Sequence, residues 1–493
     1  MANGQLHLFL IAPAMISRGR DRAFGMKLPL LGYPAVSLAM IAALTPKEFS
    51  IRIIDEANEP VPFEQPCDLA LIVGQTHHMP NAYRIADRLR ANGTTVVLAG
   101  MHVSALPEEG LEHADAVILR EAEPVWEQVL EDFGRGTLRK RYEGPEADLA
   151  SLPFIRRDLI NRKYYHPGEI IETTRGCPVG CEFCAVKDFF GSSFRLRPPE
   201  QIQQELMDIF GPRPPQAKWK DWLARTWHPD IPYFVERRLL YVMDSNFGSH
   251  PAHARAVLEV LKECDLRWYG HTSFNLTQDE AMLDLLAESG CIGMNIGFES
   301  LSQSAIDRMH KLPNRTDKYA EAIQALHDRG IGVMGTFIVG FDEDGPEVFD
   351  QIAEFVLANR LETAFVLILT PLPGTSVERD LAAQNRIISS EWSDYDHGTV
   401  TFVPRNMSPA QLHLGMRQAW RRIYSWRGIA RRILTGPKVR PFFYLPVNLG
   451  FWRCSRLLRS ETLWPVPQAE GLGSQAALAG RKEANGLDAG VSG

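Results

Sequence analysis

The feature that most restricts the fold is a regular alternation of short apolar runs with helical patterns, which occurs twice along the chain. The first series has apolar runs at 6–12, 51–55, 68–74, 95–100 and 115–119. Runs such as ALIV and VVLA are apolar throughout, as strands must be when helices cover both faces of a parallel sheet. The first series therefore predicts an α/β fold with a Rossmann-like, doubly wound parallel sheet over residues 1–140.

The second series follows a charged, proline-containing stretch, residues 141–168, that we expect to be a linker. Its apolar runs lie at 169–174, 239–244, 266–274, 292–299, 331–341 and 363–370. Six such units within residues 169–400 predict a partial (β/α)6 barrel, three quarters of an eight-fold barrel. Because barrel chemistry sits at the C-terminal strand ends, one mouth is expected to gather Cys177, Asp244, Ser273, Glu299, Gly340 and Pro371.

Two segments do not fit the alternation. Residues 211–237 contain Trp219, Trp222 and Trp227 and interrupt the barrel before its second strand. We expect a small packed cluster there, with a substrate lid as the alternative. The end of the chain, residues 470–493, is rich in Gly, Ala and Ser, which predicts a disordered tail.

The C-terminal segment of residues 401–469 is basic, although the whole chain has a formal charge of −7. Residues 405–460 hold twelve Lys and Arg and no Asp or Glu, which leaves 41 basic and 60 acidic residues elsewhere. A helix over 409–434 would carry an apolar stripe of Trp420, Ile423 and Ile433 flanked by Arg421, Arg422 and Arg432. Two interpretations fit equally: a helix lying on an anionic membrane surface, or a helix docked on the acidic barrel.

Cysteine usage indicates a reducing compartment. Three of the seven cysteines lie within eight residues, which is too clustered for a secreted disulfide scaffold. The N-terminus has no basic region before its short apolar run, and no segment reaches about 18 uninterrupted apolar residues. We therefore expect a cytoplasmic protein, with peripheral contact at the inner face of the membrane if the basic segment binds lipid.

The clustered cysteines stand in the sequence TTRGCPVGCEFC at 173–184. Cys177, Cys181 and Cys184 have CxxxCxxC spacing on the loop after the first barrel strand. A structural zinc site would need a fourth ligand, and no other cysteine has suitable spacing. A [4Fe–4S] cluster held by three cysteines keeps one iron free for an exogenous ligand, so we favour the cluster over zinc.

This motif, after the first strand of a partial barrel, resembles the radical S-adenosylmethionine superfamily. There the cysteines bind three irons, and S-adenosylmethionine chelates the fourth and is cleaved to a 5′-deoxyadenosyl radical. The resemblance implies that Cys177, Cys181 and Cys184 are cluster ligands and that an electron donor of flavodoxin or ferredoxin type reduces the cluster. It implies S-adenosylmethionine contacts for Phe183, Asp244, Asn246, Ser273, Glu299, Ile338 and Gly340. Asp244 and Glu299 also have an alternative role as loop-capping carboxylates.

The first domain resembles the cobalamin-binding domain of one large subclass, on the residues AGMHVSALPEE and GLEHADAVI. Because such sheets bind ligands at the C-terminal strand edge where strand order reverses, the resemblance places the corrin near Pro13 and the loops 74–78 and 100–104. The residues implied are Gly74, His77, His78, Gly100 and His102. Each histidine could instead be structural, and no DxHxxG signature names a cobalt ligand. Arg120 stands where the subclass has glycine.

Together these resemblances imply cobalamin-dependent methylation of an unactivated carbon in a hydrophobic small molecule, lipid, isoprenoid or pigment-like. Hopanoid and bacteriochlorophyll pathway members are similar in layout. The alternatives are cyclisation or rearrangement without methyl transfer, RNA modification with the basic segment as docking arm, and a non-enzymatic sensor. The acidic body makes nucleic acid the less favoured partner.

Overall fold

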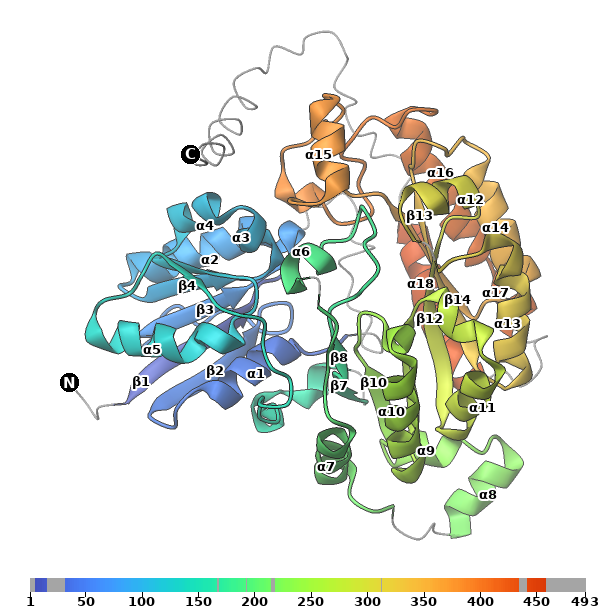
Figure 1. The fold of residues 1–493 in the computed structure, drawn as a ribbon, viewed down its shortest axis with the longest axis horizontal. Helices are drawn as coiled ribbons and strands as arrows, with labels where there is room; N and C mark the ends of the chain where they lie inside the picture. Colours follow the sequence, from blue (N-terminus) through green and yellow to red (C-terminus); the bar gives the residue numbers. More distant parts are fainter. Residues whose placement is uncertain are drawn as a thin grey trace, which may run out of the picture. The chain divides into compact units, whose positions relative to one another are not determined.

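Two parallel six-stranded sheets form the frame of the protein (Figure 1). The computed structural model describes residues 5–15, 32–165, 168–191, 193–213, 218–311, 313–433 and 441–457. All of these described residues belong to one compact unit. The α/β class, with a doubly wound sheet followed by a partial barrel, is confirmed. The predicted tail of residues 470–493 lies outside the described residues.

The first sheet has the order β2-β1-β3-β4-β5-β6, with every pair parallel. Its strands are β1 (Leu6–Ala12), β2 (Phe49–Asp55), β3 (Leu69–Val73), β4 (Thr95–Ala99), β5 (Ala116–Leu119) and β6 (Arg141–Glu143). Alternate residues of β1 enter two separate cores, one on each face of the sheet. Leu8 and Leu10 lie in one core, and Phe9 and Ile11 lie in the other. Helices therefore cover both faces: α1 (Val36–Leu44) and α5 (Trp126–Arg135) one, α2 (Met79–Ala91), α3 (Met101–Ala105) and α4 (Pro107–His113) the other.

Strand β6 lies within the stretch that the sequence indicates as a linker. Only Tyr142 of its three residues is buried, between two exposed charged neighbours, so its apolar signal is too short to detect. It pairs with β5 at the edge of the sheet, where a charged, short strand protects the edge from further pairing.

The second sheet has the order β14-β13-β12-β11-β10-β7, which follows the chain without reversal. Its strands are β7 (Glu169–Ile171), β10 (Leu239–Val242), β11 (Arg267–Thr272), β12 (Cys291–Glu299), β13 (Gly332–Val339) and β14 (Thr363–Ile368). The intervening helices are α7 (Pro199–Phe210), α10 (Pro251–Glu263), α11 (Glu280–Glu288), α12 (Gln303–Arg308), α13 (Tyr319–Asp328) and α14 (Val348–Ala358). This is the wound order of a six-unit partial barrel.

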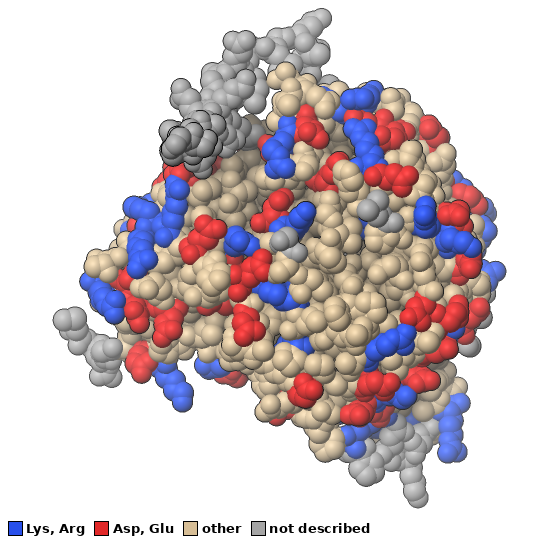
Figure 2. All heavy atoms as spheres, viewed as in Figure 1, with Lys and Arg blue, Asp and Glu red and all other residues tan. Residues whose placement is uncertain are grey.

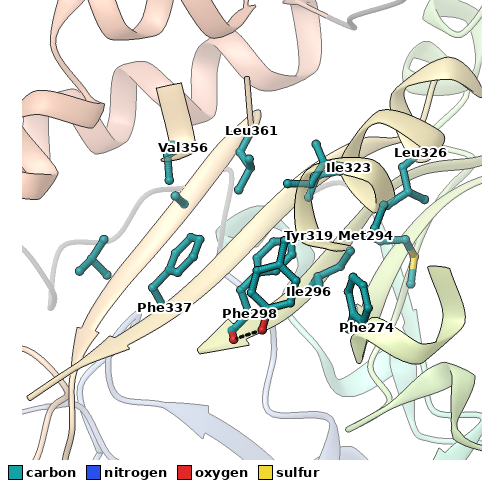
Figure 3. Close-up of a cluster of buried hydrophobic side chains, with 14 of the residues drawn as sticks. Phe274, Met294, Ile296, Phe298, Tyr319, Ile323, Leu326, Phe337, Val356 and Leu361 are labelled. Carbon is teal, nitrogen blue, oxygen red and sulfur yellow. Dashed lines mark hydrogen bonds between the residues drawn. The ribbon is translucent and has the colours of Figure 1, made fainter. Parts of the chain in front are cut away.

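A large apolar core joins the barrel strands to their outer helices. Figure 3 shows Phe298 of β12 and Phe337 of β13 packed with Tyr319, whose hydroxyl donates to the Phe298 carbonyl at 2.9 Å. The two phenylalanine rings stack with centroids 5.5 Å apart. Toward the C-terminal ends of β12, β13 and β14, the fully buried residues thus face the helices, and the alternate residues face the barrel interior.

The C-terminal segment forms three helices: α16 (Pro409–Ile423), α17 (Trp426–Ile433) and α18 (Pro441–Leu457). Trp420, Ile423 and Ile433 are buried in the core, so the apolar stripe expected from the sequence packs on the barrel. Arg432 is also fully buried and donates to the carbonyls of Leu361 and Glu362 at 2.9 and 2.8 Å. The docked-helix interpretation therefore holds for this stripe. Among the helices of the described residues, none combines the length and apolar character needed to cross a membrane.

The insertion of 211–237 contains α8 (Lys218–Thr226) and α9 (Ile231–Val235). Trp219, Trp222 and Trp227 are all exposed, so the expected packed cluster is wrong. Two further short strands, β8 (Thr174–Arg175) and β9 (Arg195–Leu196), form an antiparallel pair that the sequence does not predict. This pair closes the loop that carries the three clustered cysteines.

Candidate functional site

The loop with the three cysteines begins directly after β8 and returns through α6 (Val186–Phe190) to β9. Gly176 has φ of 91°, and a Cβ at this position would lie 2.5 Å from the carbonyl oxygen of Ser193. Only glycine fits this approach, because other residues clash both with their own backbone and with the opposite strand. The N–H of Cys184 donates to the carbonyl of Cys181 at 3.1 Å, which makes the CxxC part a tight turn.

Asp244, directly beyond β10, holds the start of this loop. One carboxylate oxygen accepts the N–H groups of Thr173 and Thr174 at 2.7 and 3.1 Å, and the other accepts the Thr173 hydroxyl. The side chain is buried, and burial raises the pKa of Asp244 to about 6 against these hydrogen bonds, which lower it. Here Asp244 acts as a loop cap, the alternative given for it above.

Asn246 connects three elements of the mouth. Its Oδ1 accepts from the N–H and the hydroxyl of Ser273 at 2.9 and 3.0 Å. Its Nδ2 lies 3.9 Å from the Sγ of Cys177, as a weak donor to sulfur. The structure thus brings together the cysteine loop, Asn246 and Ser273, as the barrel pattern predicts.

A buried ion pair of Lys311 and Glu299 lies beside the thiols. Burial raises the pKa of Cys181 to about 12 and the pKa of Cys184 to about 11. Neighbouring cysteines and Glu299 also raise these two pKa values, whereas the positive charge of Lys311 lowers them. Within the described residues, no three His, Cys, Asp or Glu side chains are already gathered as metal ligands. The donor set itself fits an iron–sulfur cluster, because three soft thiols share one water-poor loop and binding of metal deprotonates them.

Glu299 ends β12 with φ of 62°, a left-handed conformation that is costly for a residue with a Cβ. Lys311 was not found from the sequence, because it lies in a loop twelve residues after Glu299 and no motif around it points to the site. Only the folded chain places its ammonium group beside the thiols.

Phe183 and Gly340 line one small cavity of about 60 Å³ at the mouth, together with Leu369. Phe183 meets Phe341 edge to face at 6.3 Å. Gly340 has φ of 104°, and its N–H donates to Asp344 at 2.8 Å. Ile338, two residues earlier, is half-buried and contacts the main core. These three predicted positions therefore share the mouth with the cysteine loop.

The inner face of the barrel is only partly buried near the mouth, although a separate cluster that includes Tyr241, Tyr269 and Ile292 fills part of the interior. In β12, β13 and β14 every second residue stays half-buried, whereas the residues between them are fully buried against the helices. The half-buried residues are Asn295, Gly297, Met334, Thr336, Ile338, Phe365 and Leu367. Complete barrels pack their interior tightly, so the half-buried residues mark an inner wall that is incompletely covered near the mouth; we call this inner wall the lumen.

A belt of hydrogen-bonded neutral polar groups runs along the inner wall from β10 to β13. Thr336 donates to Asn295 Oδ1 at 3.1 Å, and the Nδ2 of Asn295 lies 3.5 Å from His271 Nε2. The hydroxyl of Tyr241 is 2.9 Å from the same nitrogen. Burial lowers the pKa of His271 to about 4, so the ring is neutral at physiological pH. The lumen thus offers hydrogen bonds and apolar surface to a ligand, without a charged group in this belt.

At the edge of the first sheet, the predicted glycines meet. Gly100 has φ of 115°, and a Cβ there would lie 2.8 Å from the Gly74 carbonyl; a Cβ on Gly74 would lie 3.3 Å from Pro13. These loops follow β4, β3 and β1, and the order of the sheet reverses between β1 and β3. The small residues keep backbone accessible at the switch point, which fits a large flat ligand such as a corrin.

The three predicted histidines near this edge have different surroundings. His78 accepts the Gln75 N–H on Nδ1 at 3.3 Å, so its other nitrogen carries the proton in the neutral ring. Burial lowers the pKa of His78 to about 4 and that of His77 to about 3. His102 is buried with Nε2 3.3 Å from Glu109, which also accepts from the Trp392 indole at 2.8 Å.

Arg120 keeps the backbone shape expected of a glycine. Its φ is 62°, in the left-handed region that glycine prefers, so the departure in residue type leaves the chain path unchanged. Its guanidinium donates to the Phe189 carbonyl at 3.2 Å and to Glu146 at 3.3 Å. The side chain therefore connects the edge of the first sheet to α6 of the cysteine loop.

Arg175 joins the two sheets two residues before Cys177. It donates to Glu121 at 2.6 Å and to Glu123 at 2.9 Å, both in the loop after β5, and it pairs with Glu172. Beside it lies a cavity of about 230 Å³ between the first sheet edge and the barrel, below the roughly 300–1,000 Å³ of pockets that enclose a drug-sized ligand. Its wall includes Val36, Met40, Val73, Gly100, Ile170 and Met243. A corrin would have to lie along this edge rather than inside the cavity.

Comparison with known proteins identifies the family. Residues 238–356 match the model of the radical SAM superfamily. The bacteriochlorophyllide d C-12(1)-methyltransferase of Chlorobaculum tepidum is 30% identical over 433 residues, which cover 86% of this chain and 90% of the relative. The hopanoid C-2 methylase of Rhodopseudomonas palustris is 24% identical over 375 residues, 73% of this chain and 66% of that protein.

Two solved structures share the fold. The radical S-adenosylmethionine methyltransferase TsrM from Kitasatospora setae, with tryptophan and a S-adenosylmethionine analogue bound, has a TM-score of 0.64 at 16% identity, covering 91% of this chain and 98% of TsrM. The cobalamin-dependent radical enzyme OxsB with aqua-cobalamin bound also has a TM-score of 0.64 at 16% identity, covering 92% of this chain and 72% of OxsB. The cofactors predicted from the sequence are those named for these two enzymes and for TsrM with its [4Fe–4S] cluster.

The similarity to the Chlorobaculum tepidum enzyme extends along nearly the whole of both chains, so it includes the first sheet as well as the barrel. The family resemblance inferred from the cysteine motif is thereby confirmed. The chain is a radical S-adenosylmethionine enzyme and belongs to the family that includes the bacteriochlorophyllide d methyltransferases.

Proposed function

We propose that this protein is a cobalamin-dependent methyltransferase that acts on an unactivated carbon of a hydrophobic, pigment-like or lipid-like small molecule. The observation that carries the proposal is the double attachment of the cysteine loop. Asp244 and Asn246 fix it to the barrel mouth, and Arg175 fixes its base to Glu121 at the edge of the first sheet. One loop thus connects the cluster site with the edge where a corrin would lie.

When bound, the cluster with S-adenosylmethionine would supply a hydrogen-abstracting radical, and cobalamin would supply the methyl group. The chain's own residues would position these cofactors and shield them from solvent. Cys177, Cys181 and Cys184 would hold the cluster; Phe183, Ser273, Glu299, Ile338 and Gly340 would surround S-adenosylmethionine. The paired backbones at Gly74 and Gly100 would receive the corrin, with His77 and His78 beside it.

The substrate class follows from the lumen. Its half-buried wall combines Met334, Ile338 and Leu367 with the neutral belt of Tyr241, His271, Asn295 and Thr336, whereas Phe365 packs against Trp420 and Phe451. Such a wall favours an apolar molecule with a few neutral polar atoms, since a charged group would lose its hydration without an opposite charge. The named substrates of the relatives, bacteriochlorophyllide d and hopanoids, support this class.

We include in this proposal a cytoplasmic setting, an external electron donor of flavodoxin or ferredoxin type, and contact with a membrane through residues 405–460. All seven cysteines are free, as a reducing compartment allows. On the face of the molecule that Figure 2 shows, Lys and Arg are interspersed with Asp and Glu, which supports a small-molecule substrate over a nucleic acid.

The test is anaerobic reconstitution with iron, sulfide and cobalamin, followed by a reductant and S-adenosylmethionine labelled in its methyl group. We expect 5′-deoxyadenosine from the reconstituted protein and none from Cys181→Ala. Extracts of cells that lack the gene supply candidate substrates, and we expect one of their molecules to gain the labelled methyl group. Label that stays in methionine alone while a product forms would indicate cyclisation or rearrangement, and label in RNA would indicate an RNA-modifying enzyme.

A further inference from the structure

Exposed indole rings collect at the end of the barrel opposite to the mouth. Trp219, Trp222 and Trp227 of the insertion are 53%, 58% and 72% exposed, and Trp426 at the start of α17 is 54% exposed. The ring of Trp426 lies 5.0 Å from that of Trp452 in α18. Trp452 itself is half-buried with its indole N–H enclosed, so we call the four exposed tryptophans the basal aromatic face. Single exposed apolar residues are common, but tryptophans exposed to this extent on neighbouring elements indicate a binding surface.

Three contacts place α18 and the insertion at the same end of the barrel. The hydroxyl of Tyr444 in α18 donates at 2.9 Å to the carbonyl of Ile292, at the N-terminal start of β12. Phe442, near the start of α18, lies 4.9 Å from Phe234 of α9 and 5.2 Å from His228, the residue after Trp227. Helix α18 therefore crosses the N-terminal ends of the strands, and the insertion meets it there.

Basic side chains accompany the tryptophans. Leu449, Trp452, Arg453 and Arg456 recur at helical spacing, so they share one face of α18. Arg427 follows Trp426 on α17. Arg427, Arg453 and Arg456 are exposed, and none of them has an acidic partner among the residues that the structure describes. The surrounding segment of 405–460 contains no Asp or Glu at all.

We propose that the basal aromatic face binds the surface of an anionic lipid bilayer. Tryptophan is the residue that concentrates at the boundary between lipid headgroups and hydrocarbon, because its ring is apolar and its N–H is polar. Arginines beside it are attracted by anionic lipids. The purpose of this contact, access to a hydrophobic substrate, rests on the proposed function, but the contact itself can be tested without any substrate.

Two other partners fit the face less well. An electron donor bound there would be separated from the cysteine loop by the length of the barrel, since β12 with nine residues at about 3.3 Å per residue extends roughly 30 Å. Nucleic acid is bound mainly through phosphate charge, whereas this face has more indole than guanidinium groups. A bilayer uses both kinds of side chain at once.

The experiment is co-sedimentation of the full-length protein with phosphatidylcholine vesicles, with and without phosphatidylglycerol. We expect binding only to the anionic vesicles, weakened by salt. The triple variant R427Q/R453Q/R456Q should bind these vesicles roughly tenfold more weakly or worse, because each arginine contributes to attraction at the lipid surface. The matched control R88Q/R135Q/R156Q removes three exposed arginines, two of the first domain and one of the linker, and should bind as the parent does.

A second variant tests the rings directly. Bromine-labelled lipid should quench tryptophan fluorescence of the parent protein and should quench that of W219S/W222S/W227S markedly less. Release of 5′-deoxyadenosine should stay within about twofold in both triple variants, since the altered residues are far from the mouth. A protein that releases no 5′-deoxyadenosine but still binds the vesicles would refute the proposed function and leave this inference intact.

Four results would overturn the inference. The first is sedimentation of the parent protein that does not depend on phosphatidylglycerol, and the second is binding of both triple variants as strong as that of the parent. Salt-sensitive binding of RNA that is lost in R427Q/R453Q/R456Q would assign the face to nucleic acid. Conversion of a dimer to a monomer by W219S/W222S/W227S, with vesicle binding unchanged, would assign it to a second copy of the chain.

Discussion

Asp244 fixes Thr173 by two hydrogen bonds, one to its backbone N–H at 2.7 Å and one to its hydroxyl. This contact links the end of β10 to the residue four positions before Cys177. The position of the first cysteine therefore depends on a carboxylate from the neighbouring strand.

We expect Asp244→Ala to lower the iron and sulfide content of the anaerobically reconstituted protein severalfold. The reason is that the loop loses all three hydrogen bonds that it donates to this carboxylate. Asp244→Asn keeps an oxygen for the two backbone N–H groups and should retain more of the cluster. Iron and sulfide analysis with electron paramagnetic resonance measures both. Equal iron content in the parent and Asp244→Ala would show that the loop does not need this cap.

Replacement of Cys177, Cys181 or Cys184 by alanine should remove the cluster and abolish release of 5′-deoxyadenosine, because each thiol is one of only three ligands supplied by the loop. Cys67→Ala is the matched control, since this free cysteine lies in the first domain and its thiol donates to the Leu69 carbonyl. The assignment of the ligands fails if any of the three single variants keeps full iron content and activity.

Arg175→Gln should destabilise the protein by about 3–5 kcal/mol, because it leaves the buried carboxylate of Glu121 and the half-buried carboxylate of Glu123 without this partner. Arg156→Gln breaks an exposed pair with Asp158 and should change stability by at most about 1 kcal/mol. The shift in apparent unfolding temperature of the two variants provides the comparison. Equal shifts would contradict a structural role for the junction between the sheets.

Gly332→Ala should destabilise the packing of α18, since a Cβ there would lie 2.2 Å from the hydroxyl of Tyr444. Overpacking of this kind costs about 1–3 kcal/mol. Gly134→Ala is the control: it lies in α5 with nothing within 4 Å of the added methyl group, and alanine favours a helix by about 1 kcal/mol over glycine. The two variants should therefore shift the unfolding temperature in opposite directions.

Asp344 should give a pH dependence of stability. Burial raises its pKa to about 6, although the N–H groups of Gly340 and Phe341 donate to it and lower it. The folded state holds the proton more tightly than the unfolded chain, so the contribution of this carboxyl is complete below pH of about 4 and is lost as pH rises through about 6. A difference of about two units between the folded and unfolded pKa corresponds to at most about 3 kcal/mol of folding free energy.

The variant Asp344→Asn keeps an acceptor oxygen for the two N–H groups but has no titrating proton. The stability of the parent relative to this variant should fall between pH 4.5 and 7, measured as the difference of their unfolding temperatures. A constant difference over this interval would contradict the raised pKa.

The sequence predicts the strands well where physical demands are strongest. Strands such as β3 and β4 are covered on both faces and so are apolar throughout. Strands β6, β8 and β9 have only two or three residues, too few for a periodic signal. Their formation depends on neighbours that the folded chain provides.

The site was predictable where ligands are close in sequence and not where they are distant. Cys177, Cys181 and Cys184 follow one another within eight residues, so their spacing alone indicates a cluster. Lys311 and the partner of Arg175, Glu121, are brought to the loop only by the fold. Asp244 was found from its position after the second barrel strand, but its hydrogen bonds to backbone N–H groups could be seen only in the structure.

The junction of Arg175 with Glu121 also limits how the chain can be divided. A fragment that begins at the linker would contain every cysteine of the loop, but the Arg175 guanidinium beside it would lose Glu121 and Glu123 and keep only Glu172. A fragment of the first sheet alone would retain the two carboxylates with no cation from the barrel. The protein is therefore not modular at this point, and an exchange of either half between relatives would have to transfer the matching charges with it.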